Sequence, residues 1–258
     1  MQIRIDEANR LRIIDAEGRT LLDNLDVRLE YPGELHNRLW LSAAGTWKLS
    51  QCGEVTVAQC DNAKLECRQE GDGLLVRTTF TNTTGVRLRA MYRLIVLGGH
   101  WRGTIDRCLY NEFSSFNGNY CNEMQSTVQT VRLIPDQTVT GADNVAFIDT
   151  AGTQVLFGFV TYERYFPSIS VTHEGVLAAS QDMEMHPLEP GESIIGDWLY
   201  LGTCAGIPRG LCDFADLVAR QMQVQLKPWD MPAGHCSWYY SLNTVSEKTV
   251  IENMTALA

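Results

Sequence analysis

The chain has 258 residues, of which 45% are hydrophobic and 20% are charged, as in an ordinary globular protein with a sizeable core. Its net charge of −10 argues against a nucleic-acid or anionic-membrane partner, because both need a basic face. No run approaches the roughly 18 apolar residues of a membrane span, and the first ten residues lack the apolar core of a signal peptide. We therefore expect a cytoplasmic protein without a membrane partner.

Cysteine spacing gives neither a metal pattern nor a disulfide pattern. The eight cysteines stand at positions 52, 60, 67, 108, 121, 204, 212 and 236. Without an export signal they are better explained as buried thiols than as a disulfide framework. The first three match no zinc spacing, and His100, His173 and His186 are scattered along the chain. We expect no metal and no other cofactor.

Residues 1 to about 205 are predicted to form an all-β sandwich. Apolar and polar residues alternate over 74–80 and again over 86–96, with the turn sequence Asn-Thr-Thr-Gly between them. We interpret this pattern as a hairpin with one buried face and one solvent-exposed face. Two more β-rich runs, 155–160 and 194–201, and an alternation after Pro167 continue it. Many short strands without a helical pattern indicate two packed sheets.

One amphipathic helix is predicted in the segment 206–231, between the sandwich and the C-terminal residues. Its apolar residues fall on one face, and they are Leu211, Phe214, Ala215, Val218, Ala219 and Met222. Pro228 ends any continuation. The polar face carries too little positive charge for a membrane surface. The simplest interpretation is a helix that joins two domains.

The residues after Pro232 are predicted to form one strand, a short loop and one helix. The run 236–240 is apolar and aromatic and has the length of a buried strand. Thr244 and Glu247 have capping-box spacing, and Ser246 is a second N-cap candidate. Helical spacing then relates Val250, Ile251, Met254 and Leu257. This is the repeating unit of a parallel α/β barrel, which needs about 250 residues when complete.

This segment resembles the start of the catalytic barrel in glycoside hydrolase family 36, the α-galactosidase-like enzymes of clan D. That family typically shows Pro-x-Gly-Trp-Cys-Ser-Trp-Tyr-Tyr, a loop, and a Thr-Glu-x-x-Val-x-x-Asn helix. The matching residues are Pro232, Gly234, Cys236, Ser237, Trp238, Tyr239, Tyr240, Glu247, Val250 and Asn253. His235 departs from the pattern, because it stands where the family usually has its first Trp.

The resemblance extends upstream and implies a domain organisation. In the family a β-supersandwich precedes the barrel, and its closing strands tend to show Gly-Phe-x-Thr, an aromatic stretch and Leu-x-Pro-Gly-Glu. Residues 158–161, 165–166 and 188–192 match these features in that order. The resemblance implies a β-supersandwich over 1–205, a linker helix and connector over 206–231, and an incomplete start of a (β/α)8 barrel over 232–258.

The resemblance also implies a retaining hydrolase that acts on α-galactoside oligosaccharides. Retaining glycosidases use two carboxylates about 5–5.5 Å apart. In the family both are aspartates on later barrel strands, which lie beyond Ala258, so no catalytic residue can be named and the chain itself is expected to be inactive. Asp182 and Glu184 share one face of a predicted strand, but solvated residues beside a turn explain them at least as well.

The resemblance places two aromatic residues near a sugar subsite. Trp238 would stand at the C-terminal end of the first barrel strand, the end where barrel active sites form, and Tyr239 is the second candidate. Packing in the barrel core would explain either ring nearly as well.

Two alternatives to the hydrolase remain, namely a stand-alone sandwich that binds carbohydrate and a module that assembles homo-oligomers. A binding module has no use for one strand and one helix of a barrel, so the hydrolase is favoured. A transferase that builds raffinose-type sugars on the same fold is also compatible with the sequence.

Overall fold

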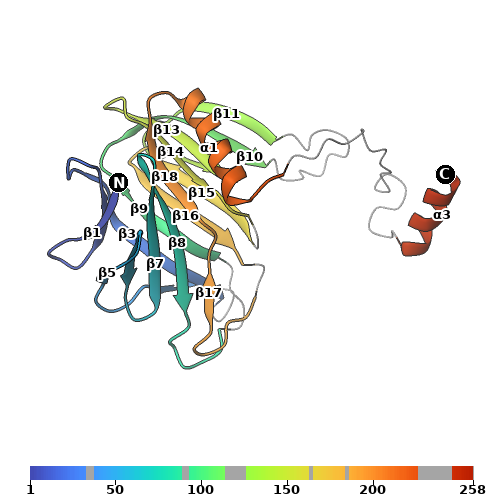
Figure 1. Cartoon of the computed structure of the whole chain (residues 1–258), viewed down its shortest axis with the longest axis horizontal. Helices are drawn as coiled ribbons and strands as arrows, with labels where there is room; N and C mark the ends of the chain where they lie inside the picture. Colours follow the sequence, from blue (N-terminus) through green and yellow to red (C-terminus); the bar gives the residue numbers. More distant parts are fainter. Residues whose placement is uncertain are drawn as a thin grey trace. The chain divides into compact units, whose positions relative to one another are not determined.

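The computed structural model describes residues 1–32, 38–88, 93–113, 126–162, 165–183, 186–225 and 246–257. The chain divides into two compact units, Met1–Gln223 and Val224–Ala258, which we describe separately. In the described part of the first unit, the strands form two antiparallel sheets, and helix α1 lies against the second sheet (Figure 1). The prediction of a mainly β protein is confirmed.

Within the described residues, the first sheet has eight strands in the order β1-β2-β3-β9-β16-β15-β12, with β4 also paired to β3. Their bounds are β1 Gln2–Ile5, β2 Leu11–Ile14, β3 Thr20–Pro32, β4 Arg38–Ser42, β9 Arg93–Trp101, β12 Thr138–Gly141, β15 Phe166–Thr172 and β16 Val176–Asp182. The centre of the sheet joins segments that are remote in sequence, because β9 pairs with β3 on one side and with β16 on the other.

The second sheet has ten strands within the described residues, in the order β11-β10-β13-β14-β18-β8-β7-β6-β5, with β17 also paired to β8. Their bounds are β5 Lys48–Cys52, β6 Val55–Gln59, β7 Ala63–Glu70, β8 Gly73–Thr81, β10 Ile105–Phe113, β11 Ser126–Arg132, β13 Asn144–Asp149, β14 Gln154–Phe159, β17 Ser193–Ile195 and β18 Leu199–Cys204. The run predicted as one strand over 194–201 is thus divided between β17 and β18.

The core of the sandwich lies between the two sheets. Buried apolar side chains of both sheets form one cluster, so the sheets pack face to face. Trp101 of the first sheet is fully buried, and its ring packs edge-on against Phe147 of the second sheet, with 5.4 Å between the ring centroids. The Trp101 indole N–H donates to Asp149 at 3.1 Å, which satisfies the one polar atom of that side chain inside the core.

The predicted hairpin over 74–96 is wrong. β8 pairs with β7, β17 and β18 in the second sheet, whereas β9 belongs to the first. Between them, the Asn82 amide donates to the carbonyl oxygens of Val86 at 2.8 Å and Leu188 at 2.9 Å, and Leu88 pairs with Leu188. These bonds hold the segment after β8 against Leu188, so the chain does not turn back to pair with β8. The turn sequence sets a local bend, but it does not determine which sheet the next strand joins.

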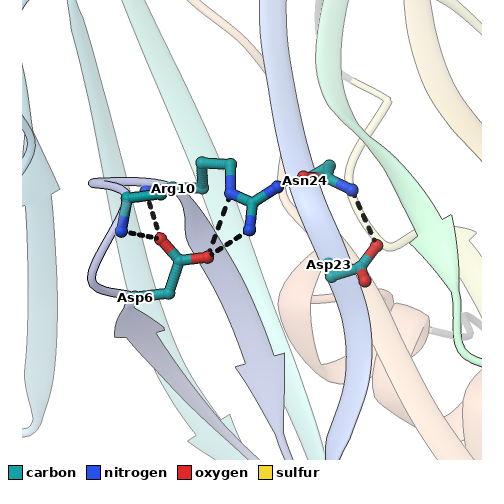
Figure 2. Close-up of polar contacts among 5 residues, drawn as sticks. Asp6, Arg10, Asp23 and Asn24 are labelled. Atoms are coloured by element: carbon teal, nitrogen blue, oxygen red, sulfur yellow. Dashed lines mark hydrogen bonds and ion pairs between the residues drawn. The ribbon is translucent and has the colours of Figure 1, made fainter.

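The turn between β1 and β2 shows how short polar contacts fix the edge of the first sheet (Figure 2). The Asp6 carboxylate accepts the backbone N–H groups of Ala8 and Arg10, both at 2.9 Å, and the Arg10 Nε at 3.0 Å. Arg10 also donates to the Asn24 side chain on β3 at 3.0 Å. The hydrogen bond from the Arg10 backbone, with the guanidinium beside it, holds the pKa of Asp6 below its ordinary value.

Helix α1 spans Ile207–Gln221 and is fixed to the second sheet at its start. The Ile207 N–H donates to the Gln154 side chain of β14 at 2.8 Å, so a strand residue satisfies one free N–H of the first turn. Gly210, Phe214 and Leu217 are its buried residues. The predicted amphipathic helix is therefore present, and its buried face packs on β14 and β18.

The second unit contains helix α3, Glu247–Leu257. Ser246 caps it, because its hydroxyl accepts the Thr249 N–H at 3.2 Å. Val250, Ile251 and Met254 are exposed. The predicted strand over 236–240 and the alternative cap Thr244 lie outside the described residues.

The described cysteines carry free thiols. Cys60, Cys67 and Cys108 are buried, Cys204 is half-buried, and Cys52 and Cys212 are exposed. Burial raises the pKa of Cys67 to about 12, with a contribution from neighbouring Glu66, and it raises the pKa of Cys108 to about 12 as well. Cys121 and Cys236 lie outside the described residues.

Candidate functional site

The residues that the sequence singles out for carbohydrate chemistry are mostly outside the described part of the chain. Trp238, Tyr239 and Glu184 fall there, and so does His235. Asp182 is described, and it is an exposed residue at the end of β16, opposite Arg93 of β9. The subsite role of the two aromatic residues and the pairing of Asp182 with Glu184 therefore stay predictions.

A cavity of about 440 Å³ lies between α1 and strands β10 and β13 of the second sheet. Its described lining residues are Leu109, Asn111, Asp143, Asn144, Tyr162, Leu211, Phe214, Ala215 and Val218. Leu109 and Asn111 are two positions apart on β10, so both point to the face of the sheet that α1 covers. Asp143 and Asn144 come from the start of β13, and Tyr162 follows the end of β14. Four segments thus meet at one cavity.

Asp143 and Tyr162 form part of the polar rim of the cavity. The Tyr162 hydroxyl lies 2.7 Å from the Phe159 carbonyl oxygen and 3.4 Å from the Asp143 carboxylate. A phenol has one proton, so the shorter contact takes it and the longer one adds little. Burial, followed by the negative charges of Asp143 and Asp197, raises the pKa of Tyr162. The phenol therefore stays protonated at neutral pH, and the Asp143 carboxylate keeps most of its acceptor capacity.

Two asparagine amides line the cavity, and neither side chain bonds to another residue in the described part of the chain. Asn144 is 9% exposed, and its side chain makes no hydrogen bond to another described residue. The Asn111 amide on β10 likewise bonds to no described residue. Buried amides are normally hydrogen-bonded, because an unsatisfied one costs about 1–3 kcal/mol. Among the described residues nothing occupies these two amides, so water or a ligand in the cavity can reach them.

The opposite wall of the cavity is apolar and comes mainly from α1. Phe214 packs closely on β14, because a Cβ atom added at Gly158 would lie 2.6 Å from the Phe214 ring. Its ring centroid is 6.2 Å from that of Tyr200 on β18. Leu211, Ala215 and Val218 continue this wall along the helix. Gly158 thus allows α1 to approach the sheet closely beside the cavity.

A second polar cluster lies close to Tyr162 and is satisfied internally. Asp197 accepts from the Gln181 amide at 2.5 Å and from the Thr161 hydroxyl at 3.1 Å, and its own N–H donates to Gln181 at 2.9 Å. The Thr161 hydroxyl in turn accepts the Trp198 N–H at 2.9 Å. These buried groups are hydrogen-bonded to one another, so the cluster links the two sheets and is not part of a ligand site.

The described lining of the cavity does not include a pair of carboxylates. Asp143 is the one acidic residue among the described lining residues, whereas a retaining glycosidase needs two carboxylates. In the described part of the chain, no group of three or more histidine, cysteine, aspartate or glutamate residues could hold a metal ion. No described helix is long and apolar enough to cross a membrane.

Comparison with known proteins finds similarity to solved structures. No family model matches the chain, and no curated protein matches it. A family 36 α-galactosidase of Geobacillus stearothermophilus, AgaA, is 14% identical over 76% of this chain and 30% of its own, with a TM-score of 0.41. A polysaccharide lyase is 10% identical over 84% of this chain and 34% of its own, with a TM-score of 0.44.

A small protein of Synechocystis, Slr1438, is also similar, with 10% identity over 80% of this chain and 96% of its own and a TM-score of 0.46. The chain spans about a third of the length of the α-galactosidase and of the lyase. Similarity at this level does not assign an activity to the chain.

Proposed function

We propose that this chain is the N-terminal, non-catalytic portion of a retaining α-galactosidase-like glycoside hydrolase that acts on α-galactosides. The observation that carries the proposal is the sequence from Pro232 to Asn253, which resembles the first strand, loop and helix of the family 36 barrel. It follows a two-sheet β-sandwich and a helix, which is the order of elements in that family. The chain alone is expected to be inactive, because the resemblance puts both catalytic aspartates on later barrel strands.

The apolar side chains of α3 fit a barrel helix. Val250, Ile251 and Met254 are 38%, 56% and 54% exposed. An amphipathic helix of 11 residues is only marginally stable unless such a face is buried. In a (β/α)8 barrel each helix packs its apolar face against the strands. A following strand and helix would supply that cover for α3.

Within this proposal, Trp238 and Tyr239 line the sugar subsite of the completed barrel. They would stand at the C-terminal end of its first strand, where barrel enzymes form their active sites. An indole ring can pack on the apolar face of a hexose while the later aspartates carry out the chemistry. Trp238 is then a substrate-positioning residue.

The proposal is tested by the coding sequence downstream of Ala258 and by an activity assay. We expect an open reading frame with aspartates at the ends of two later strands. The extended protein should hydrolyse an aryl α-galactoside, whereas the 258-residue chain should not. Trp238→Ala in the extended protein should lower kcat/KM, while Trp40→Ala, an exposed tryptophan of β4, should leave it unchanged. A natural stop codon after Ala258, or turnover by the short chain, would refute the proposal.

A further inference from the structure

We propose that the cavity between α1 and strands β10 and β13 binds a neutral monosaccharide, free or as one unit of a glycan. The sandwich would provide this site without the barrel, so the inference does not rest on the proposed function. It rests on the Asn144 amide, which is 9% exposed, faces the cavity and bonds to no described residue.

The size and the lining of the cavity fit one sugar ring. A volume of about 440 Å³ falls in the lower part of the usual range for small-molecule pockets, about 300–1,000 Å³. An apolar ligand would leave the polar groups of Asn111, Asp143 and Asn144 without partners, at a cost for each. A pyranose presents hydroxyl groups at its edge and C–H groups on its face, and the polar rim and the Phe214 wall have the same two-sided character.

The chemistry of the rim favours a neutral ligand over a charged one. No described lining residue is cationic, and the Asp143 carboxylate repels an anion. A cation could pair with Asp143 and the amide oxygens, but it would leave the N–H groups of Asn111 and Asn144 to water. Sugar hydroxyls both donate and accept, so they can satisfy the carboxylate and the two amides together. The Tyr162 phenol, whose proton goes to the Phe159 carbonyl oxygen, adds one more acceptor.

The experiment is a titration of the 258-residue chain followed by ¹H–¹⁵N NMR, with D-galactose and D-glucose as neutral probes and D-galacturonate as the charged probe. We expect saturable shifts at the amides of Asn111, Asp143 and Asn144 and along α1, with Kd in the millimolar range, as is usual for a single sugar ring with few contacts. D-galacturonate should bind about tenfold more weakly, because it adds like charge beside Asp143.

Two matched pairs of variants locate the binding. Ala215→Trp places a large ring in the cavity from an exposed helix position, and we expect at least a tenfold loss of affinity with an unchanged Tm. Asp216→Trp adds the same ring at an exposed α1 position that does not line the cavity, and it should bind as the parent does. Asp143→Asn should lose about tenfold, since it removes a charged acceptor. Asp136→Asn, an exposed site with the same charge change, should lose nothing.

Three results would overturn the site. They are no saturable binding of either neutral sugar up to about 100 mM, shifts that cluster away from the cavity, and full affinity in both Ala215→Trp and Asp143→Asn. Stronger binding of D-galacturonate than of D-galactose would show that the ligand class is wrong. None of these results depends on residues beyond Ala258, so failure here is distinct from failure of the proposed barrel.

Discussion

Replacing Phe214 by alanine tests how α1 is held on the sandwich. The Phe214 side chain is 6% exposed and packs on Gly158, with Tyr200 beside it. Removal of a buried phenylalanine ring costs about 3–5 kcal/mol. One side of this ring borders the cavity and lacks packing partners there, so we expect the lower end of that range, about 3 kcal/mol.

Urea denaturation measures this loss. With an m-value of about 3 kcal/mol/M, the unfolding midpoint of Phe214→Ala should fall by about 1 M at an unchanged m-value. Val86→Ala is the control, because Val86 is 62% exposed and such a change should stay within about 0.5 kcal/mol. A loss below about 1 kcal/mol for Phe214→Ala would show that the ring does not anchor the helix.

A second substitution makes the test specific to the contact. A Cβ atom at Gly158 would lie 2.6 Å from the Phe214 ring and 2.7 Å from the Asn144 Cβ, so Gly158→Ala alone should destabilise by about 1–3 kcal/mol. In the Phe214→Ala background the first clash is gone. The double variant should therefore lose less than the sum of the two single losses. Strict additivity would refute the packing described above.

Two further predictions concern titratable groups. Thiol labelling of the native protein at neutral pH should modify exposed Cys52 quickly and should leave Cys67 and Cys108 unmodified until unfolding, because burial raises the pKa of each to about 12; rapid native labelling of either, mapped by mass spectrometry, would contradict their burial. For Asp6, whose pKa is lowered chiefly by the Arg10 backbone hydrogen bond, the stabilisation is present above the ordinary carboxyl pKa of 3.8 and is lost as pH falls through the lower folded value. Thermal melts should therefore show a shallower acid decline for Asp6→Asn than for the parent, and parallel declines would exclude this linkage.

The sequence predicts where strands occur better than it predicts which strands pair with each other. The alternation over 74–80 and the β-rich run over 155–160 appear as β8 and β14, because period-two alternation and β-branched runs report local burial. The turn sequence that starts at Asn82 was equally compatible with a hairpin and with a crossing between sheets. The deciding contacts, with Leu188, lie about a hundred residues further along the chain, and no local pattern contains them.

The helix and the cavity show the same limit. The predicted apolar face of α1 includes Phe214 and Ala215, yet Leu217 is buried and Ala215 is exposed. The close approach of α1 to the sheet at Gly158 determines which helix residues are buried. The helical repeat in the sequence does not contain this information. The cavity rim could not be predicted either, because Asn111 and Asn144 are ordinary strand residues in the sequence and gain a shared site only through the pairing of β10 with β13.

The pairing of β8 with β18 has a consequence for the order in which the protein is made. Leu74 and Val76 find their neighbours in Leu201 and Leu199, about 120 residues later in the chain. During synthesis, the β8 edge of the strands from β5 to β8 therefore stays unpaired until β17 and β18 have left the ribosome. A nascent chain stalled before Leu199 exposes that edge to other chains. Such an unpaired edge invites association with other chains until the late strands cover it.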